Sequence, residues 1–592
     1  MIDTEISKVF DRRSALFLTT GMVLTSVLVL RMLQMQVFNY RDYKKKSENN
    51  SFRIQVNMPQ RGNILSANGK TISHDAPIYR IYIIPEETDD LENLVSMVAR
   101  DLNLTQKRVD KIWQRIKKQQ KFQPVLVSEN TNWNILAGLQ AKNLDGLHIE
   151  SGYARVYELG PAGAQLFGYV GAPDKPVANT PFYTHGITGL EKQFNKELSG
   201  VFGQNVMITN AVGRVTGEDK TQFKPSIMGS DIQTTINDNI QRTLYDQLTL
   251  HKSGCGVAID IETGDILAMA STPSFDPNYF SGDDAEEYIA GLRQNFAKPF
   301  MNKVFEGLYP PGSTFKIVVA LAALEAGAVT PNETVFCPGH WDYGDRRYHC
   351  WESKGHGRVN LVGALKHSCD IYFYQLALRI GIDAIKRMAI RLGMTEKYME
   401  DIISKQMPGV IPDRTWKETN IGSKWVHGDT IISGIGQGFI LVNCMQLAVM
   451  VARVASNKRV VPRLIKENSV PQFESMDFQE KNLKLVLNGL EEVTKKGGTA
   501  AGSAINVKGA KMGGKTGTSQ VRSISRAERI SGVLTNEQLK WNMRNHGLFV
   551  GYAPTNAPRY AVCVITEHSG GSGSAARTAA SVLKELLTNN PG

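Results

Sequence analysis

The sequence has no low-complexity block, no internal repeat of fixed period and no second long apolar run. The missing repeats exclude a solenoid, and the missing second run argues against a protein with several membrane spans. The sequence also lacks zinc-finger repeats, a basic heptad region and an aromatic RNA-binding signature. We therefore expect no nucleic-acid partner.

The composition is ordinary for a folded protein, with 42% hydrophobic and 21% charged residues. At 592 residues the chain is too long for one compact core, so we expect two or more domains. The formal net charge is +11. This basic excess suits work near an anionic surface such as phospholipid or cell-wall polymer, and it equally suits a solvated surface without a partner.

The single apolar run lies near the N-terminus. Residues 15–30 carry no charge, and apolar character resumes after Arg31 and continues to Phe38. At ~1.5 Å per residue the run spans ~36 Å, which is enough to cross a hydrocarbon core of ~30 Å. No small-x-small cleavage site follows, so the run favours an uncleaved anchor at residues 14–38 over a signal peptide. Basic residues flank both ends, and charge counting therefore does not set the orientation.

The next region, residues 39–230, mixes strand-like alternation with polar turns and predicts a separate domain. Residues 80–85 predict a strand, and residues 90–102 predict an amphipathic helix. Residues 216–225 are charged and weakly apolar, which indicates a connector.

The remaining region, residues 231–592, has a different texture and predicts a second domain. Two apolar runs at residues 256–261 and 265–271 flank a Glu-Thr-Gly turn, which predicts a hairpin. A second strand pair and a closing helix are predicted near the C-terminus, at residues 547–552, 560–567 and 575–587. Strands at both ends of a helix-rich middle predict an α+β or α/β domain whose antiparallel sheet is flanked by helices.

A candidate nucleophile stands in this second domain. Ser313 follows a Pro-Pro-Gly break and stands three residues before Lys316, at the start of an apolar segment. On a helix both side chains share one face near the N-terminus, where backbone N–H groups and the dipole favour negative charge. A neutral lysine can then accept the hydroxyl proton. Ser-x-x-Lys alone is common, and the alternative is a helix N-cap followed by a surface lysine.

Two further motifs accompany this pair. Ser368 and Asp370 stand at a predicted turn before an apolar helix, where helix capping is the alternative. Lys515, Thr516 and Gly517 lie in a segment that can form an edge strand. There the lysine offers a cation for a carboxylate, and the glycine lets one backbone approach another. The alternative for this segment is a turn or a phosphate loop.

The phosphate loop has to be weighed, because residues 509–516 (GAKMGGKT) match the Walker pattern at every position. Such a loop follows a buried apolar strand and opens a helix. Residues 501–506 make a poor strand, and residues 517–522 make a poor helix start. A nucleotide-binding protein is therefore the less favoured alternative.

The three motifs occur in the order and approximate spacing of the penicillin-recognising serine acyltransferases. The chain resembles the class B penicillin-binding proteins, and within them the elongation-specific group, penicillin-binding protein 2. The resemblance covers nearly the whole chain, and further motifs carry it at residues 61–64, 186–191, 355–358 and 428–438. Asp370 stands where the wider superfamily has Asn, which the elongation group tolerates.

This resemblance implies a serine-type D-Ala-D-Ala transpeptidase. Ser313 would attack the carbonyl of the penultimate D-alanine of a stem peptide, with Lys316 as the base. Ser368 would relay the proton to the leaving D-alanine, and Asp370 would hold the lysine and a substrate amide.

The resemblance also implies how the substrate is held. Lys515 and Thr516 would bind its carboxylate beside Gly517, and the backbone N–H groups of Ser313 and Thr518 would form the oxyanion hole. Each such donor is typically worth ~2.7–4 kcal/mol in the transition state. An amine of a neighbouring stem peptide would take the acyl group, and β-lactams would stall as esters.

The implied setting is the bacterial inner membrane. Residues 1–13 would form a cytoplasmic tail, residues 39–230 a pedestal (dimerisation-type) domain and residues 231–592 a periplasmic transpeptidase domain. A separate membrane glycan polymerase and scaffold proteins of the elongation machinery would be partners. A septal transpeptidase and a β-lactam sensor are the alternatives, although a sensor would need several spans or a cytoplasmic output domain.

Four residues between and within the two serine motifs predict a metal site. Cys337, Cys350, His356 and Cys369 make a closed tetrahedral set for Zn²⁺ with a structural role. The resemblance points the same way, although penicillin-binding protein 2 relatives have acids at the first two positions. One disulfide with a free thiol, or unpaired thiols, are the alternatives. Three other histidines could substitute as ligands: His340, His349 and His367. The remaining three cysteines are expected in the core: Cys255, Cys444 and Cys563.

Overall fold

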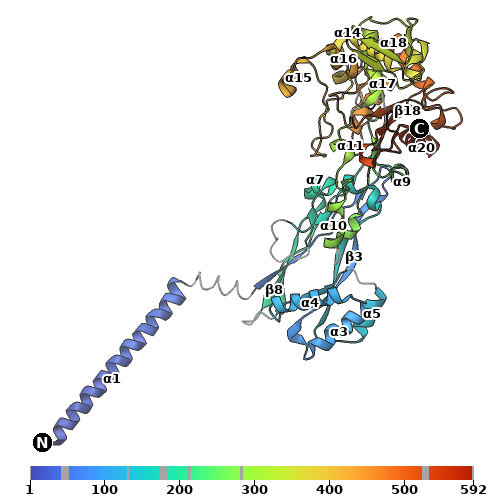
Figure 1. Ribbon diagram of the computed structural model, residues 1–592. Helices are drawn as coiled ribbons and strands as arrows, with labels where there is room; N and C mark the ends of the chain where they lie inside the picture. The colour runs from blue at the N-terminus through green and yellow to red at the C-terminus, as the bar shows by residue number, and fades with distance from the viewer. Residues whose placement is uncertain are drawn as a thin grey trace. The chain divides into compact units, whose positions relative to one another are not determined.

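The computed structural model describes residues 2–39, 41, 52–129, 133–173, 183–209, 215–280, 285–522, 528 and 532–589. Its contacts divide the chain into two units, whose elements Figure 1 labels. The first comprises Met1–Gln60, Pro173–Tyr183 and Gly200–Met228, and the second comprises Arg61–Ala172, Thr184–Ser199 and Gly229–Gly592. The region expected to form a pedestal, residues 39–230, thus contributes to both units.

The first unit begins with a long helix, α1 (Ile2–Leu33), which continues into a π-helical turn, η1 (Gln34–Phe38). The segment Ser14–Phe38 has a mean hydropathy of 1.9, and none of its apolar window is buried. It is the one helix among the described residues that is long and apolar enough to cross a membrane. Its length and composition match the predicted anchor.

The first unit also contains a three-stranded antiparallel sheet in the order β1 (Phe52–Asn57), β8 (Gly203–Thr209) and β9 (Val215–Lys224). The expectation of a connector at residues 216–225 is wrong, because this segment is β9. The described side chains of β9 are exposed or half-buried, so no apolar alternation marks the strand. Backbone pairing with β8 holds it instead.

In the second unit, the N-terminal sheet is built around β3 (Thr71–Ile83), which contains the strand predicted at residues 80–85. It pairs with β5 (Leu147–Tyr157) along its whole length, and with β2 (Ile64–Leu65) and β4 (Val125–Ser128) near its two ends. β10 (Ile232–Gln233) joins β2 in parallel and leads the chain towards the C-terminal sheet.

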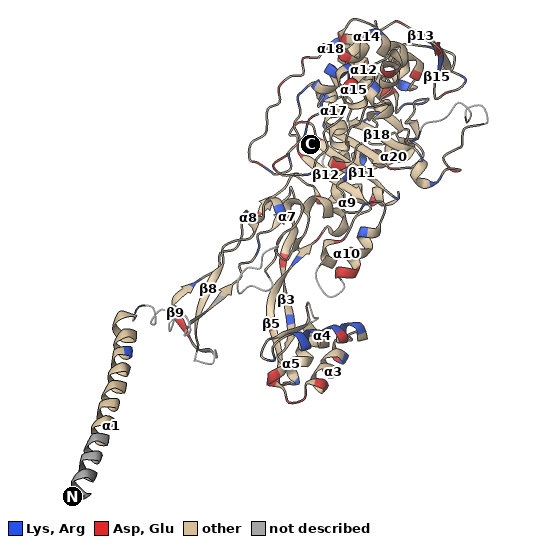
Figure 2. Cartoon of the chain, turned by 60° about the vertical axis from the view of Figure 1, so that its left-hand side comes forward, with Lys and Arg blue, Asp and Glu red and all other residues tan. Residues whose placement is uncertain are grey.

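Three helices pack on the end of this sheet: α3 (Leu91–Asp101), α4 (Gln106–Lys118) and α5 (Trp133–Ala141). Their apolar faces share a buried cluster with β3 and β4. The predicted helix at residues 90–102 is confirmed as α3, with Asp90 as its N-cap. The outer face of α4 is strongly basic, as Figure 2 shows.

A buried ion-pair network lies beside this sheet. Glu191, whose side chain is fully buried, accepts hydrogen bonds from Arg61 Nε and Arg155 Nε, both at 2.7 Å, and from the hydroxyl of Ser73 at 3.1 Å. A buried carboxylate is stable only when it is paired and hydrogen-bonded in this way. Arg61 and Glu191 come from the two segments whose motifs resemble the pedestal of the class B proteins.

The C-terminal sheet has five antiparallel strands in the order β12 (Ile266–Thr272), β11 (Gly254–Asp260), β19 (Tyr560–Thr566), β18 (His546–Ala553) and β17 (Gly513–Ser519). The predicted hairpin is β11 and β12, and the predicted C-terminal strand pair is β18 and β19. The sheet is therefore assembled from sequence-distant halves, as predicted, and β17 forms its edge.

Helices cover both faces of this sheet. Successive side chains of a strand point to opposite faces, so neighbouring residues of one strand contact different helices. α9 (Asp238–Thr249) and α20 (Gly573–Asn589) pack on the face to which Val564 contributes. α17 (Cys444–Ser456) packs on the opposite face, to which Cys563 contributes. The sheet is buried on both sides, which matches the expected architecture.

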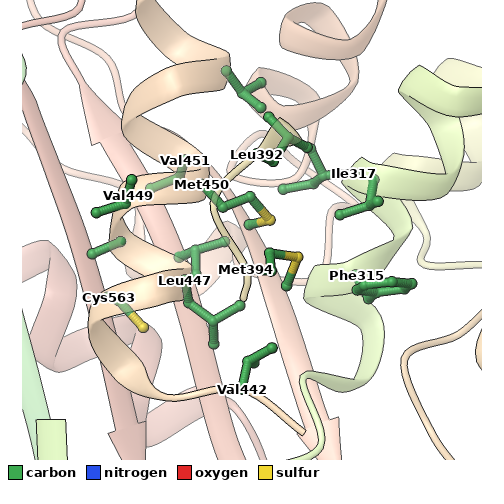
Figure 3. Close-up of a cluster of buried hydrophobic side chains, with 14 of the residues drawn as sticks. Phe315, Ile317, Leu392, Met394, Val442, Leu447, Val449, Met450, Val451 and Cys563 are labelled. Carbon is green, nitrogen blue, oxygen red and sulfur yellow. The ribbon is translucent and has the colours of Figure 1, made fainter. Parts of the chain in front are cut away.

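The core under α17 continues towards the candidate nucleophile. Figure 3 shows Leu447 and Met450 of α17 packed between Cys563 of the sheet and the side chains of Phe315 and Ile317. The apolar segment after Ser313 is thus anchored in the main core, which fixes the start of its helix.

The helical region contains α12 (Lys316–Glu325), α13 (Leu361–Lys366), α14 (Asp370–Arg391), α16 (His427–Ser433) and α18 (Glu480–Glu492). α14 packs against α12 and α16, and α13 packs against α18. The shorter elements are α6 (Ala164–Phe167), α7 (Gly189–Gln193), α8 (Asn195–Leu198), α10 (Ala285–Gln294), α11 (Lys303–Glu306), α15 (Arg414–Ile421), β6 (Val170–Gly171), β7 (His185–Gly186), β13 (Val335–Cys337), β14 (His340–Tyr343), β15 (Arg346–His349) and β16 (Gly357–Val359).

Candidate active site

Ser313 lies in a 3₁₀ turn, η5 (Gly312–Phe315), that leads directly into α12. The sequence predicted that Ser313 opens an α-helix. In the structure residues 312–315 form the tighter 3₁₀ turn, and the α-helix begins at Lys316. In a 3₁₀ turn side chains three residues apart eclipse each other, so Ser313 and Lys316 still share one face. Ser313 is half-buried, whereas Lys316 is fully buried.

The buried ammonium group of Lys316 is surrounded by acceptors. Nζ donates to the carbonyl oxygen of Ser368 at 2.7 Å and to Asp370 Oδ1 at 2.8 Å, and it lies 3.2 Å from Ser368 Oγ. The charged form of Lys316 can use all three of its donors on these partners, whereas the neutral form has a lone pair that can accept a proton. A buried charge is tolerated only with such pairing, so Ser368 and Asp370 hold Lys316 in place beside the nucleophile.

Ser368 occupies the turn between α13 and α14 in a left-handed conformation, with φ of 55°. Such a conformation costs a non-glycine residue of the order of 1–3 kcal/mol and persists only where the surroundings impose it. The side chain is nearly buried, and its hydroxyl points between two lysines. The strained turn therefore sets the position of a functional hydroxyl.

Lys515 reaches the same hydroxyl from the sheet. Its Nζ lies 2.9 Å from Ser368 Oγ, and the side chain is fully buried. Burial, reinforced by the charge of Lys316, holds the pKa of Lys515 well below the ordinary lysine value. A lysine poised in this way can exchange a proton with the hydroxyl, so Lys316, Ser368 and Lys515 form a continuous path for a proton.

The phosphate-loop alternative is not supported by this geometry. Residues 513–519 form the extended strand β17, and Lys515 pairs in register with Val550 of β18. A Walker lysine stands at the start of a helix that follows a loop, and none of these residues is helical.

The nucleophile turn and β17 are in close contact at two glycines. A Cβ added to Gly312, whose φ is 55°, would lie 2.6 Å from the carbonyl oxygen of Thr518. A Cβ on Gly517 would lie 2.9 Å from the side chain of Thr314. Only glycine permits this approach, which places Ser313 against the strand that carries Lys515 and Thr516.

Three residues outside the three catalytic motifs also belong to the site. Thr499 Oγ1 lies 2.7 Å from Thr516 Oγ1, and Gln437 Nε2 donates to the carbonyl oxygen of Thr518 at 3.1 Å. The backbone N–H of Trp351 donates to Asp370 Oδ2 at 2.9 Å. Sequence reasoning missed Thr499 and Trp351, because neither stands at a diagnostic spacing. Gln437 lay within the glycine-rich segment 428–438 that carried part of the resemblance.

The four predicted metal ligands lie together behind this site. Cys337, Cys350, His356 and Cys369 each offer one ligand atom, and these atoms all lie within 4.8 Å of one another. His356 Nδ1 is 3.6 Å from Cys337 Sγ and 3.5 Å from Cys350 Sγ. The cluster touches the catalytic turn, because Cys350 Sγ accepts the backbone N–H of Asp370 at 3.4 Å.

The other cysteines and histidines are not part of this cluster. All six cysteines are free thiols in the structure, so the disulfide alternative has no support in its geometry. The remaining three cysteines are buried in the core, as predicted: Cys255, Cys444 and Cys563.

Comparisons with known proteins identify the family to which the chain belongs. Residues 254–588 match the penicillin binding protein transpeptidase domain, and residues 56–234 match the penicillin-binding protein dimerisation domain. The peptidoglycan D,D-transpeptidase MrdA of Acinetobacter baumannii is 32% identical, with 97% of this chain and 88% of that protein covered. The chain belongs to the penicillin-binding protein 2 family. MrdA of Escherichia coli K12 is 29% identical over 99% of this chain and 94% of its own length.

Solved structures of penicillin-binding protein 2 share the fold. The Helicobacter pylori protein in its complex with MreC matches with a TM-score of 0.76 and 24% identity, over 91% of this chain and 99% of that chain. The Pseudomonas aeruginosa protein bound to WCK 5153 matches with a TM-score of 0.65 and 28% identity, over 91% and 98%. The expected fold class is thereby confirmed.

Within this family member, the cysteine cluster has the chemistry that a zinc ion requires. Three thiols and one imidazole form a complete tetrahedral donor set, and Zn–S bonds of about 2.3 Å with a Zn–N bond of about 2.0–2.1 Å place the nitrogen about 3.6 Å from each sulfur. The observed separations of 3.5 and 3.6 Å are close to that value. The residues present therefore fit a structural metal.

Proposed function

We propose that this protein is a membrane-anchored peptidoglycan D,D-transpeptidase that cross-links stem peptides during cell elongation. One observation carries the proposal: the hydroxyl of Ser368 lies between two buried lysines, Lys316 and Lys515. This arrangement serves a serine acyl-enzyme. The MrdA relatives bear the same activity in their names.

The first half-reaction would acylate Ser313. Its oxygen forms a bond to the carbonyl carbon of the penultimate D-alanine of the donor peptide while neutral Lys316 accepts the hydroxyl proton. The backbone N–H groups of Ser313 and Thr518 stabilise the oxyanion. The amide bond then breaks, and Ser368 passes a proton to the amine of the departing D-alanine.

The second half-reaction would transfer the acyl group to an amine of a neighbouring stem peptide. The amine loses its proton through the same residues, and Ser313 is released with its hydroxyl restored. Lys515 and Thr516 hold the terminal carboxylate of the donor before it departs. A β-lactam carries an equivalent carboxylate and acylates the same serine, but its ring fragment stays attached and blocks the acceptor.

We place the N-terminus in the cytoplasm and the region after Phe38 in the periplasm of the inner membrane, since the substrate lies outside that membrane. The apolar segment Ser14–Phe38 supports the anchor. A separate glycan polymerase and scaffold proteins of the elongation machinery are the proposed partners. The Helicobacter pylori relative, whose solved structure is a complex with MreC, supports a scaffold partner.

We also propose that Cys337, Cys350, His356 and Cys369 hold a zinc ion. When bound, the ion would supply a structural cross-link between the hairpin β14–β15 and the start of α14. Cys350 and its neighbour Trp351 contact Asp370 directly, so this link would keep the carboxylate in place beside Lys316.

Labelling of membranes with fluorescent penicillin tests the nucleophile. Ser313→Ala should abolish the labelled band, whereas Ser404→Ala, at an exposed serine, should leave it intact. Lys515→Ala should fold and label weakly. Full labelling of Ser313→Ala would contradict the assignment.

A second measurement separates the enzyme from a β-lactam sensor. The purified protein, supplied with a lipid-linked precursor and a polymerase, should release D-alanine and form cross-links. Acylation without release of D-alanine would favour the sensor. Depletion in cells should produce round cells, and filaments would point to the septal alternative.

A further inference from the structure

Thr499 and Thr516 form a hydroxyl pair at the mouth of the active site. Their Oγ1 atoms are 2.7 Å apart. Thr516 lies on β17 and is 6% exposed, whereas Thr499 is exposed in the segment between α18 and η6 (Ala501–Ser503). The pair therefore joins a nearly buried residue of β17 to a solvent-exposed residue.

The segment that carries Thr499 is tied to both walls of the site. The backbone N–H of Thr499 donates to the carbonyl oxygen of Lys366 at 3.4 Å, two residues before Ser368. Five residues before Thr499, the hydroxyl of Thr494 donates to the carbonyl oxygen of Met512 at 2.7 Å, directly before β17. Lys366 also pairs with Glu492 at 2.8 Å. The hydroxyl of Thr499 is thus held at a fixed place relative to β17.

The protons of the pair decide what it can bind. Each hydroxyl has one proton to donate, and a carboxylate can only accept. If Thr516 donates to Thr499, it has no proton left for a ligand. If Thr499 donates to Thr516, the proton of Thr516 is free to point at a ligand carboxylate. A bound carboxylate therefore selects one of the two directions.

We propose that Thr499 is a positioning residue for carboxylate recognition, which donates its hydroxyl proton to Thr516 and so directs the proton of Thr516 at the carboxylate of the donor peptide or of a β-lactam. The inference rests on the proposed function. It deepens that function by assigning part of the preference for anionic ligands to a residue outside the three catalytic motifs. A ligand without a carboxylate draws no benefit from this arrangement.

The test compares two substitutions and two ligands in the full-length protein. Thr499→Val keeps the shape and removes the hydroxyl, and Thr499→Ser keeps the hydroxyl. The second-order acylation rate constant is measured with benzylpenicillin and with its uncharged methyl ester. Because one hydrogen bond is lost, Thr499→Val should slow acylation by benzylpenicillin by about 2- to 12-fold. It should not slow the ester, and Thr499→Ser should restore most of the rate.

A double substitution tests whether Thr499 acts through Thr516. In a Thr516→Val background, Thr499→Val should cause no further loss with benzylpenicillin, because its partner is already absent. Equal slowing of the ester, failure of Thr499→Ser to rescue, or additive losses would each overturn the proposal. Failure of the proposed function would give a different result, because Ser313→Ala would then still be acylated by both compounds.

Discussion

Lys515 Nζ lies 2.9 Å from the hydroxyl oxygen of Ser368, although 147 positions separate the two residues in the sequence. The contact joins an edge strand to a strained turn, and it places the same hydroxyl within 3.2 Å of Lys316. Burial and the nearby charge of Lys316 hold the pKa of Lys515 well below the ordinary lysine value. The relationship has a consequence for pH dependence.

The rate of acylation by anionic β-lactams should begin to fall at a lower pH than it would if Lys515 had the ordinary lysine pKa. Burial and Lys316 lower the pKa of Lys515, so its cation is present at lower pH and is lost as the pH rises through that lowered value. Loss of the cation weakens carboxylate binding. The acylation rate constant of benzylpenicillin, followed from about pH 6 to about pH 10, checks this, because a lysine with the usual pKa of about 10.4 would keep most of its charge over that range. An identical alkaline fall for the methyl ester would contradict it.

Asp370→Ala should slow acylation by about 10²-fold or more, at the lower end of the range for a disturbed general base. The substitution removes the oxygen that accepts from Lys316 Nζ at 2.8 Å. Asp342→Ala is the matched control, because Asp342 forms an exposed ion pair with Arg347 at 2.7 Å. The control should acylate at the normal rate. Equal rates for both variants would show that Asp370 has no part in placing the base.

Purified protein should contain about one zinc ion per chain, as expected for a closed set of four ligands. Cys350→Ser should lose most of it, and Cys444→Ser, at a buried core thiol, should keep it. Trp351 provides a second readout, since its ring centroid lies 5.6 Å from that of His356. Removal of zinc with a chelator should change its fluorescence and slow acylation. A metal-free wild type with full activity would refute the site.

Glu191→Gln should lower the free energy of unfolding by about 3 kcal/mol or more, because it removes the charge that buried Arg61 and Arg155 share, and Asp75 remains as a partner of Arg155 alone. The carboxylate accepts from Arg61 and Arg155 with no exposed surface of its own. Glu287→Gln removes an ion-pair partner of Lys107 in a pair whose side chains are 77% and 71% exposed, and it should cost far less stability, because solvent screens exposed pairs. Urea unfolding of the detergent-solubilised protein compares the two. Equal losses would contradict the assigned role of burial.

Gly312→Ala should abolish acylation in a protein that still folds. The added Cβ would meet the carbonyl oxygen of Thr518 at 2.6 Å, and the turn would have to move away from β17. Gly327→Ala separates this clash from backbone strain, because Gly327 also has a positive φ, of 64°, but nothing lies within 4 Å of its Cβ position. The control should lose some stability and keep its acylation rate. Normal acylation by Gly312→Ala would show that the turn can adjust.

Much of the fold could be predicted from the sequence, because apolar alternation marks strands that are buried on one or both faces. The segments that became β11 and β12 carry that signal together with a Glu-Thr-Gly turn, and the structure pairs them. β9 carries no such signal, since its described side chains are exposed or half-buried and its pairing is entirely a matter of backbone hydrogen bonds. Such strands cannot be recognised from hydrophobic pattern.

The candidate site was predictable to the extent that its residues stand in motifs. The spacing of Ser313 and Lys316 follows from helical geometry, which the 3₁₀ turn preserves. Thr499 could not be found in this way, because its role depends on a loop that folds back onto β17 from 17 positions away. Trp351 contributes a backbone N–H, and no side-chain pattern reports where a backbone donor will point.

The close contact between Gly312 and Thr518 limits how this protein can escape its inhibitors. No side chain can be added at residue 312 or 517 to obstruct a drug without displacing the nucleophile that the natural reaction needs. Selection by β-lactams is therefore confined to the periphery of the site, where a residue can change while the glycines stay. Thr499, exposed and coupled to carboxylate recognition, is the kind of position at which resistance could evolve with a tolerable loss of cross-linking.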